Sequence, residues 1–334
     1  MMGEGKQLAV LGAAILCLYL FGRGAPQEQS TLRERAETNA LVSESAENEK
    51  GYTTHIIRAP AALSQDWEEA FFSPSEAEAP VEMTISGAIL LKNETAYPID
   101  PWSVVESGPV IRLTANEPQI LIIHTHSSEA YTPAGLDRYE PSDSVRTEDS
   151  EHNIIRIGDE LARLFEQAGL HVIHDRGVYD YPSYTGSYSR SGAAVERYLR
   201  EYPSLRVVLD VHRDALGSDD VIYKTVAEEA GTCASQAMLL VGTDESGLEH
   251  PNWRDNLSLA LYLQNVLAAE HPTLMRPVAL VPQRYNQQLC RGMLILEVGS
   301  SGNTLQEALA AARLFASSAA PALLALVDQG GAEA

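Results

Sequence analysis

A short apolar run at 120–123 leads directly into two histidines and a glutamate, at His124, His126 and Glu129. Four apolar residues behind Pro118 predict a buried strand. Neutral imidazoles and carboxylates are good donors to a zinc ion, and a His-x-x-Glu pair can reach one ion from a single turn. The sequence therefore predicts part of a zinc site at the end of this strand.

Two further apolar runs end in residues that could complete such a site. The run at 207–210 leads into His212 and Arg213, and the run at 294–296 leads into Glu297. Ligands of open α/β sheets bind beyond the carboxyl ends of the strands. If the three strands are neighbours in one sheet, their ends converge. One such residue alone is more often structural, but three on matching strand ends favour a metal site.

The residue types suggest a division of roles. His126, Glu129 and His212 would form a zinc site with two histidines, one carboxylate and a position open to water. Glu297 comes from a different strand. It would take a proton from that water as the water attacks an amide carbonyl, and would return the proton to the leaving nitrogen.

Two roles stay open at this point. Arg213 would either stabilise an oxyanion or a substrate carboxylate, or form a structural salt bridge to Asp214. His124 would either replace His126 as a ligand or orient a ligand from behind.

Two further stretches have a functional and a structural interpretation. Acidic residues precede the next predicted helix: Glu148, Asp149 and Glu151. One of them could be a ligand, although acids are favoured at helix N-termini in any case. Four tyrosines between positions 179 and 188 could wall a groove for a sugar or peptide, or belong to an ordinary surface loop.

Strands and helices alternate after Pro118. Strands are predicted at 120–124, 170–173, 205–211, 221–226, 237–241, 278–281 and 293–298. Helices are predicted at 153–168, 193–202, 256–270 and 304–326. This alternation predicts an α/β three-layer sandwich on a mainly parallel sheet.

The chain divides into four predicted parts. Residues 1–23 would form a cytoplasmic stub and a membrane anchor, because positions 8–21 carry no charge. We expect an uncleaved signal-anchor, with a cleaved signal peptide as the alternative. Residues 24–55 are polar and predict a flexible tether, and 56–113 an irregular preface. The main domain would occupy 114–330.

Composition excludes some classes of protein. The net charge is −22, from 46 acidic and 24 basic residues, which argues against a nucleic-acid partner. Three cysteines leave the compartment open: Cys233 and Cys290 could pair in an exported chain, but two buried free thiols are the simpler interpretation. Serine-hydrolase, phosphate-binding-loop and dinucleotide-binding motifs are absent from the sequence.

Several stretches, in order over about 115 to 325, resemble the stage II sporulation protein P family. They are His124-Thr-His-Ser-Ser-Glu-Ala-Tyr, Asn153-Ile-Ile-Arg-Ile-Gly-Asp-Glu-Leu, the tyrosine-rich loop ending at Ser191, Asp210-Val-His-Arg-Asp-Ala and Glu297-Val-Gly-Ser-Ser-Gly-Asn. The resemblance implies a peptidoglycan hydrolase that acts during engulfment. It would cut the N-acetylmuramoyl-L-alanine amide bond and, as an endopeptidase, the peptide cross-links. The resemblance also implies stage II sporulation proteins D and M as partners.

The same resemblance implies a fold and a location. The fold would be that of the zinc-dependent cell-wall amidases, which are related to zinc carboxypeptidases. His126-Ser-Ser-Glu129 with His212 fits the carboxypeptidase pattern, whereas the usual amidase pattern places a glutamate ligand shortly before the following helix. The protein would be a single-pass protein of the cell membrane, with its catalytic domain outside the cytoplasm at the sporulation septum.

Two other hypotheses remain beside a zinc amidase and endopeptidase of peptidoglycan. One is a metallopeptidase that trims free peptides. The other is a membrane-tethered module that binds the wall without catalysis. The presence of His126, Glu129, His212 and Glu297 argues against the second.

Overall fold

The computed structural model describes residues 89–217, 221–229 and 231–328 together with three earlier strands. These strands are β1 (Glu44–Glu47), β2 (Thr53–Arg58) and β3 (Glu82–Ser86). The predicted membrane anchor and much of the predicted tether lie outside the described residues. Within the described part of the chain, no helix is both long and apolar enough to cross a membrane.

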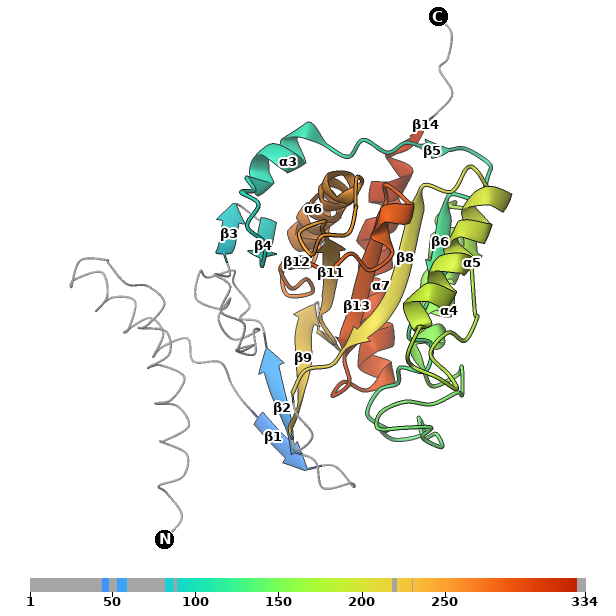
Figure 1. Ribbon diagram of the computed structural model, residues 1–334. Coiled ribbons are helices and arrows are strands. Elements are labelled where there is room, and N and C mark those ends of the chain that lie inside the picture. Colours follow the sequence, from blue (N-terminus) through green and yellow to red (C-terminus); the bar gives the residue numbers. More distant parts are fainter. Residues whose placement is uncertain are drawn as a thin grey trace, which may run out of the picture.

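An eight-stranded sheet forms the centre of the molecule, in the order β3-β4-β12-β11-β13-β8-β6-β7 (Figure 1). Its other strands are β4 (Ile89–Asn93), β6 (Ile120–Ile123), β7 (Val172–His174), β8 (Val207–Asp214), β11 (Ala237–Gly242), β12 (Val278–Val281) and β13 (Met293–Ser300). Five of its seven pairings are parallel. The predicted mainly parallel sheet is therefore confirmed.

The sheet has two parallel halves that run in opposite directions. Strands β7, β6, β8 and β13 are parallel to one another, as are β4, β12 and β11. The halves meet at the antiparallel pair β11–β13, and β3 adds an antiparallel edge. The carboxyl ends of β6, β8 and β13 consequently lie at one edge of the sheet.

Helices cover both faces of the sheet. They are α3 (Pro101–Ser107), α4 (Ile154–Gln167), α5 (Ser187–Glu201), α6 (Trp253–Glu270) and α7 (Leu305–Leu324), with a short 3-10 helix η2 (Gln287–Leu289). Helices α4 and α6 pack against α7, and the three share one large apolar core with the sheet. Helix α5 shares a second apolar cluster with the opposite face. The predicted three-layer sandwich is confirmed.

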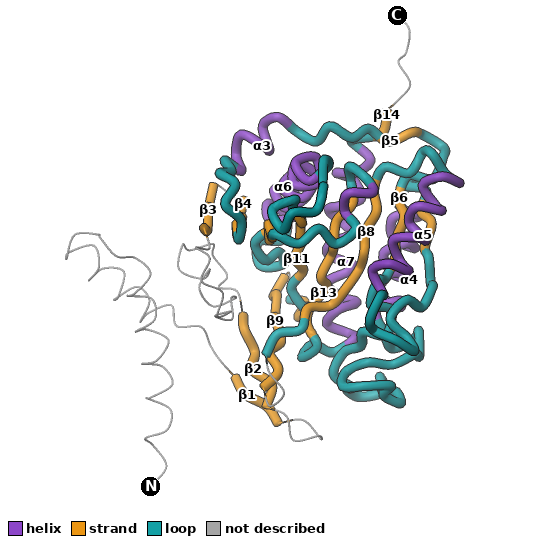
Figure 2. The backbone as a smooth tube through the Cα atoms, viewed as in Figure 1, coloured by secondary structure: helices purple, strands orange, loops and turns teal. Residues whose placement is uncertain are grey.

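Two smaller sheets flank the main one (Figure 2). The first has the order β1-β2-β9-β10, with β9 (Val221–Glu229) and β10 (Thr232–Ala234). The second joins β5 (Leu113–Thr114) to β14 (Val327–Asp328), so both ends of the main domain are paired.

The predicted irregular preface needs correction. Residues 56–113 contain β3, β4, α3 and β5, and β4 pairs with β12 inside the central sheet. Leu90 N donates to Gln264 Oε1 on α6, which fixes this segment to the domain. The sequence did not indicate this because the strand is five residues long and its partner is almost 190 residues away. The division into domains itself stays a prediction.

Two element boundaries beside the candidate residues differ from the prediction. Helix α5 begins at Ser187, because Gly186 adopts a left-handed conformation (φ 85°) that ends the tyrosine-rich loop there. Strand β8 continues through His212 to Asp214, because β13 pairs with it along that length. The tyrosine and histidine side chains at these positions are therefore held by regular elements.

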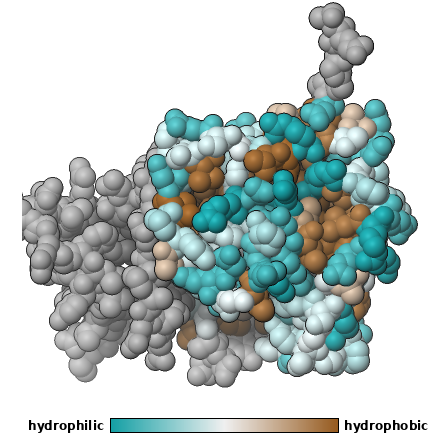
Figure 3. Space-filling model, turned by 45° about the horizontal axis from the view of Figure 1, so that its top comes forward, coloured by the Kyte–Doolittle hydropathy of each residue, from teal (hydrophilic) through white to brown (hydrophobic). Residues whose placement is uncertain are grey.

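The surface is mainly hydrophilic on the face drawn in Figure 3, with several separate apolar patches. Large apolar side chains that are exposed include Trp102, Val110, Leu136, Val178, Tyr181, Tyr184 and Leu248. No disulfide joins Cys233 to Cys290: the first is exposed and the second buried. The prediction that both are buried is wrong for Cys233, because β10 lies at the edge of its sheet.

Candidate active site

The strands that carry the candidate residues are neighbours. β8 lies between β6 and β13 and is parallel to both. His212 on β8 and Glu297 on β13 are directly paired in register. The predicted convergence of three strand ends is therefore confirmed.

The alternation of side chains along β8 decides which face holds the site. Leu209 and Val211 belong to the core beneath α4, α6 and α7, whereas Val208 packs in the cluster beneath α5. Because successive side chains of a strand point to opposite faces, Asp210 and His212 lie on the α5 face with Val208. Glu297 is the partner of His212 and lies on this face as well.

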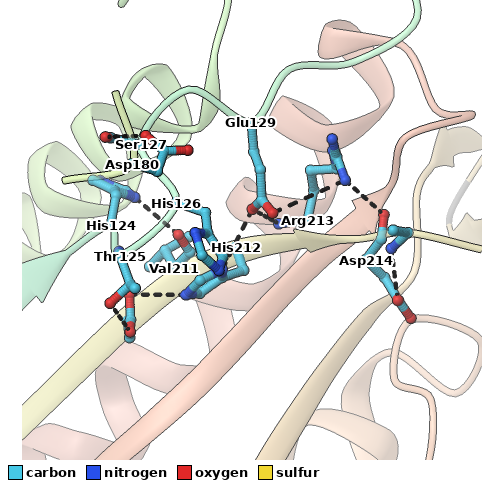
Figure 4. Close-up of polar contacts among 12 residues, drawn as sticks. His124, Thr125, His126, Ser127, Glu129, Asp180, Val211, His212, Arg213 and Asp214 are labelled. Carbon is cyan, nitrogen blue, oxygen red and sulfur yellow. Dashed lines mark hydrogen bonds and ion pairs between the residues drawn. The ribbon is translucent and has the colours of Figure 1, made fainter. Parts of the chain in front are cut away.

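The structure brings His126, Glu129 and His212 together (Figure 4). His212 Nδ1 lies 3.3 Å from Glu129 Oε2. The rings of His126 and His212 are nearly perpendicular, with centroids 5.2 Å apart. All three residues are buried. Their proximity agrees with the prediction, and their role as metal ligands stays a prediction.

Three polar atoms in this region are enclosed and have no hydrogen-bond partner: His126 Nδ1, His212 Nε2 and Glu297 Oε2. His212 Nε2 is 3.0 Å from Asp210 Oδ1, but the two atoms are not aligned for a hydrogen bond. Buried polar atoms are nearly always satisfied, so three exceptions in one place indicate a functional site. In the described part of the chain, no three or more His, Cys, Asp or Glu side chains are already arranged as a metal cluster.

The environment gives three of these residues different proton affinities. Burial lowers the pKa of His126 to about 4, so its ring is neutral at pH 7. Burial opposes ionisation of Glu129, but the neighbouring Arg213 and His212 lower the pKa of Glu129 to about 2. Burial raises the pKa of Glu297 well above its usual range, and nearby carboxylates add to this effect. Two glutamates with pKa values moved in opposite directions suit one anionic role and one proton-transfer role.

His124 is not part of this group. Its Nδ1 is 3.0 Å from the carbonyl oxygen of Val211, and its Nε2 is 2.9 Å from His174 Nε2. His174 Nδ1 is in turn 3.1 Å from Asp159. Helix α4 can approach the two rings because position 158 is glycine: a Cβ at Gly158 would collide with both imidazoles. The structure thus directs His124 toward α4, while the turn that follows it carries His126 to the α5 face.

Arg213 does not form the predicted salt bridge to Asp214, and its catalytic role stays a prediction. Its Nε donates to the carbonyl oxygen of Ala130 at 3.0 Å, and its Nη2 donates to that of Val145 at 3.1 Å. The Asp214 carboxylate pairs with Arg276 instead, at 2.6 Å. The buried guanidinium of Arg213 therefore holds the loop that follows β6, because it bonds two main-chain carbonyls of that loop.

The acidic residues before α4 lie elsewhere. They border a cavity of about 400 Å³ lined by Glu140, Pro141, Ser142, Thr147, Glu148 and Asp149. Asp149 accepts hydrogen bonds from the main chain of Glu151 and pairs with His152 at 2.8 Å. No hydrogen bond or ion pair found among the described residues joins them to His126, Glu129 or His212. Helix α4 is capped by Asn153 and has no acidic residue in its first turn, so the capping interpretation is wrong as well.

Sequence reasoning missed the contribution of Asp210. Its carboxylate is fully buried and accepts hydrogen bonds from the main-chain N and the hydroxyl of Thr125, at 2.8 and 2.6 Å. It also lies beside His212 Nε2. A carboxylate this close to the far nitrogen of a ligand histidine favours one orientation of its ring through its charge, without an aligned hydrogen bond. The spacing Asp210-x-His212 was a usable signal, because residues two apart on a strand share a face.

Two residues of the tyrosine-rich loop also contribute. The Tyr184 hydroxyl is 3.0 Å from His126 Nε2, and the two rings stack with centroids 4.5 Å apart. The buried Asp180 carboxylate accepts hydrogen bonds from the hydroxyls of Ser127 and Ser128 and from Arg146 Nη1. This loop therefore fixes the turn that carries His126 and Glu129.

The chain is a three-layer α/β protein with a histidine and carboxylate centre at the carboxyl ends of its parallel strands. It belongs to the stage II sporulation protein P family, whose model matches residues 23–320. A curated relative, stage II sporulation protein P of Bacillus subtilis (strain 168), is 25% identical over 217 residues, which are 60% of this chain. The match spans about half (50%) of the length of that relative.

Solved structures with a similar fold are more distant. N-acetylmuramoyl-L-alanine amidase AmiC2 of Nostoc punctiforme is 14% identical with a TM-score of 0.37, and covers 63% of this chain and 97% of its own. The CwlD amidase from Clostridioides difficile, solved in complex with the GerS lipoprotein, is 13% identical with a TM-score of 0.37. It covers 62% of this chain and 98% of its own. Nothing about the site follows from likenesses this distant.

The contacts of Arg213 predict the effect of removing its charge. Arg213→Met keeps the length of the side chain but loses the hydrogen bonds to Ala130 and Val145. We expect the free energy of unfolding to fall by about 2–4 kcal/mol in urea titrations, since buried charged donors of this kind contribute that much. Arg291→Met, at an exposed arginine of equal length, should change it by less than about 0.5 kcal/mol. Unchanged stability of Arg213→Met would return Arg213 to a purely catalytic role.

Proposed function

We propose that this protein is a zinc-dependent peptidoglycan hydrolase. It cuts the N-acetylmuramoyl-L-alanine amide bond in the septal wall during sporulation engulfment. As an endopeptidase, it also cuts the peptide cross-links of that wall. The observation that carries the proposal is the convergence of buried His126, Glu129 and His212 beside Glu297, where His126 Nδ1 and Glu297 Oε2 have no hydrogen-bond partner. Membership of the stage II sporulation protein P family supports the choice of substrate.

The donor atoms fit a zinc ion. His212 Nδ1 and Glu129 Oε2 are 3.3 Å apart. Two ligand atoms on one tetrahedral zinc, with bonds of about 2.1 Å, are separated by about 3.4 Å. His126 offers an enclosed nitrogen without a partner, on a ring that is neutral at pH 7. The set of two imidazoles and one carboxylate is a common catalytic zinc site.

The chain's own residues divide the remaining work. When bound, zinc would act as a Lewis acid toward water and the amide carbonyl. Glu297 accepts the proton of the attacking water at its free Oε2 and passes it to the leaving nitrogen. Asp210 keeps the His212 ring in one orientation, and Arg146 and Arg213 keep Glu129 ionised and in place.

Product analysis separates this function from its two alternatives. A zinc amidase incubated with purified wall sacculi releases material with new free amino groups on muropeptide stems. A peptidase of free peptides would instead release single amino acids from soluble peptides. A binding module would be retained on sacculi and release nothing. The unpaired donor atoms favour the hydrolase over the binding module, since a surface for binding alone has no need of them.

The location and partners follow from the family resemblance. We propose a single-pass membrane protein anchored through residues 1–23, with its catalytic domain outside the cytoplasm at the sporulation septum. Stage II sporulation proteins D and M would be its partners there. A reporter enzyme fused after Ala334 separates the two orientations: activity restricted to the cytoplasm would contradict this placement.

Zinc content tests the proposed ligands. The purified chain should carry about one zinc ion after dialysis, measured by elemental mass spectrometry. His212→Ala should carry almost none, because two remaining ligands hold zinc poorly. His271→Ala is the matched control, since its ring contacts Ser317 away from the site and its zinc content should match the wild type. Full zinc occupancy in His212→Ala would remove His212 from the ligand set.

Glu297→Gln tests the proton-transfer role. The substitution is nearly isosteric and removes only the ability to accept a proton, so zinc content and stability should be retained. Turnover on sacculi should fall by about 10²–10⁴-fold, the usual contribution of a general acid–base group. Glu166→Gln, at an exposed position of α4, should leave turnover unchanged. Joint loss of zinc and activity would make Glu297 a ligand, and wild-type turnover would exclude both roles.

A further inference from the structure

Amide hydrolysis builds negative charge on the carbonyl oxygen, and a fixed hydrogen-bond donor at that oxygen accelerates the reaction. The cationic side chains nearest to the site are already engaged. Arg213 donates to main-chain carbonyls, and Arg146 bonds Asp180 and Ser128. A side-chain donor for the substrate, if one is used, is therefore a residue other than these two arginines.

Tyr188 has the position and the free hydroxyl that this role requires. It lies in the first turn of α5, and its ring meets that of His126 edge-on, with centroids 5.4 Å apart. The residue is half-buried, and its hydroxyl forms no hydrogen bond with the described residues and is not enclosed by them. The hydroxyl of Tyr184, in contrast, is already hydrogen-bonded to His126 Nε2. Tyr188 therefore presents an open donor beside the proposed ligands.

Two neighbouring residues, Tyr285 and Asn286, hold Tyr188 in this position. Asn286 Nδ2 donates to the carbonyl oxygen of Tyr188 at 2.7 Å, and the Tyr285 ring packs against that of Tyr188 with centroids 5.6 Å apart. Tyr285 and Asn286 both have positive φ angles, 49° and 62°. Two consecutive non-glycine residues in this region cost free energy, which is typical of segments that position a functional group.

We propose that Tyr188 is a catalytic residue whose hydroxyl donates a hydrogen bond to the carbonyl oxygen of the scissile amide as negative charge develops on it. The proposal rests on the proposed amidase function. Tyr188 forms and breaks no covalent bond and keeps its proton throughout. In support, burial raises the pKa of the Tyr188 phenol, and the neighbouring Asp210 and Glu297 carboxylates raise it further.

Tyr188→Phe tests the proposal, because it removes the hydroxyl and keeps the ring. With soluble muropeptides as substrate, kcat should fall by about 10²–10³-fold, the usual effect of losing one such donor. KM, zinc content and the thermal unfolding midpoint should stay at wild-type values. A phosphinic analogue of the scissile amide, which carries its charge on a tetrahedral centre, should bind by calorimetry about 10²-fold more weakly to Tyr188→Phe. Tyr202→Phe, at the opposite end of α5, is the matched control and should keep wild-type kcat and wild-type analogue affinity.

Each other outcome has a defined meaning. Wild-type kcat in Tyr188→Phe, or an equal loss of kcat in the control Tyr202→Phe, would overturn the role of Tyr188. Lost zinc or a lowered unfolding midpoint in Tyr188→Phe would make the residue structural and would also overturn it. If 3-fluorotyrosine at position 188, a stronger donor of nearly the same size, leaves kcat and analogue affinity below the wild type, the proposal is rejected. A wild-type chain that releases no product would reject the amidase function itself and the role of Tyr188 with it.

Discussion

The pairing of β8 with β6 on one side and β13 on the other is the constraint on which the site depends. This order places three strand ends at one edge of the sheet, and the register sets His212 directly beside Glu297. A shift of one residue in the register would move every side chain of β8 to the opposite face. Val208, Leu209 and Val211 prevent such a shift, because each is buried in one of the two apolar clusters. Hydrophobic packing in the middle of the strand thus fixes the chemistry at its end.

The site is held together by buried charged side chains that pair with one another. Each of these charges would destabilise the fold if its partner were missing. Glu129 is buried beside Arg146 and Arg213, and Asp180 beside Arg146. An isolated buried carboxylate would bind a proton instead of staying ionised. The loops after β6 and before α5 therefore stabilise each other through shared charges. His126 Nδ1 and Glu297 Oε2 remain without a partner in the centre and are available to a ligand.

Sequence patterns predicted the elements well where apolar residues determine them. The strands at 120–123 and 278–281 and the helix at 154–167 agree with the predicted ranges within one residue. Strand β4 was not predicted, because five residues carry little periodicity and its pairing with β12 is remote in sequence. Local patterns therefore gave the fold class, while long-range pairing set the limits of the main sheet.

The candidate site was predicted in part for similar reasons. His126, Glu129 and His212 were identified because they follow apolar strands. The sequence alone did not decide whether His124 or His126 is the ligand. All four residues of β6 are apolar, so the pattern does not indicate which side chains point to the α5 face of the sheet. Arg213 was assigned by residue type alone, and its partners are main-chain atoms that no sequence pattern reveals. Tyr188 is remote from the other residues in sequence, and only the docking of α5 brings it to His126.

X-ray diffraction at the zinc absorption edge, from crystals of the zinc-loaded chain, tests the central claim most directly. We predict one strong anomalous peak about 2.1 Å from donor atoms of His126, Glu129 and His212, with Glu297 adjacent but not bound. A peak between His124 and His174, or in the acidic cavity beside Glu140 and Asp149, with none near His212, would contradict the account.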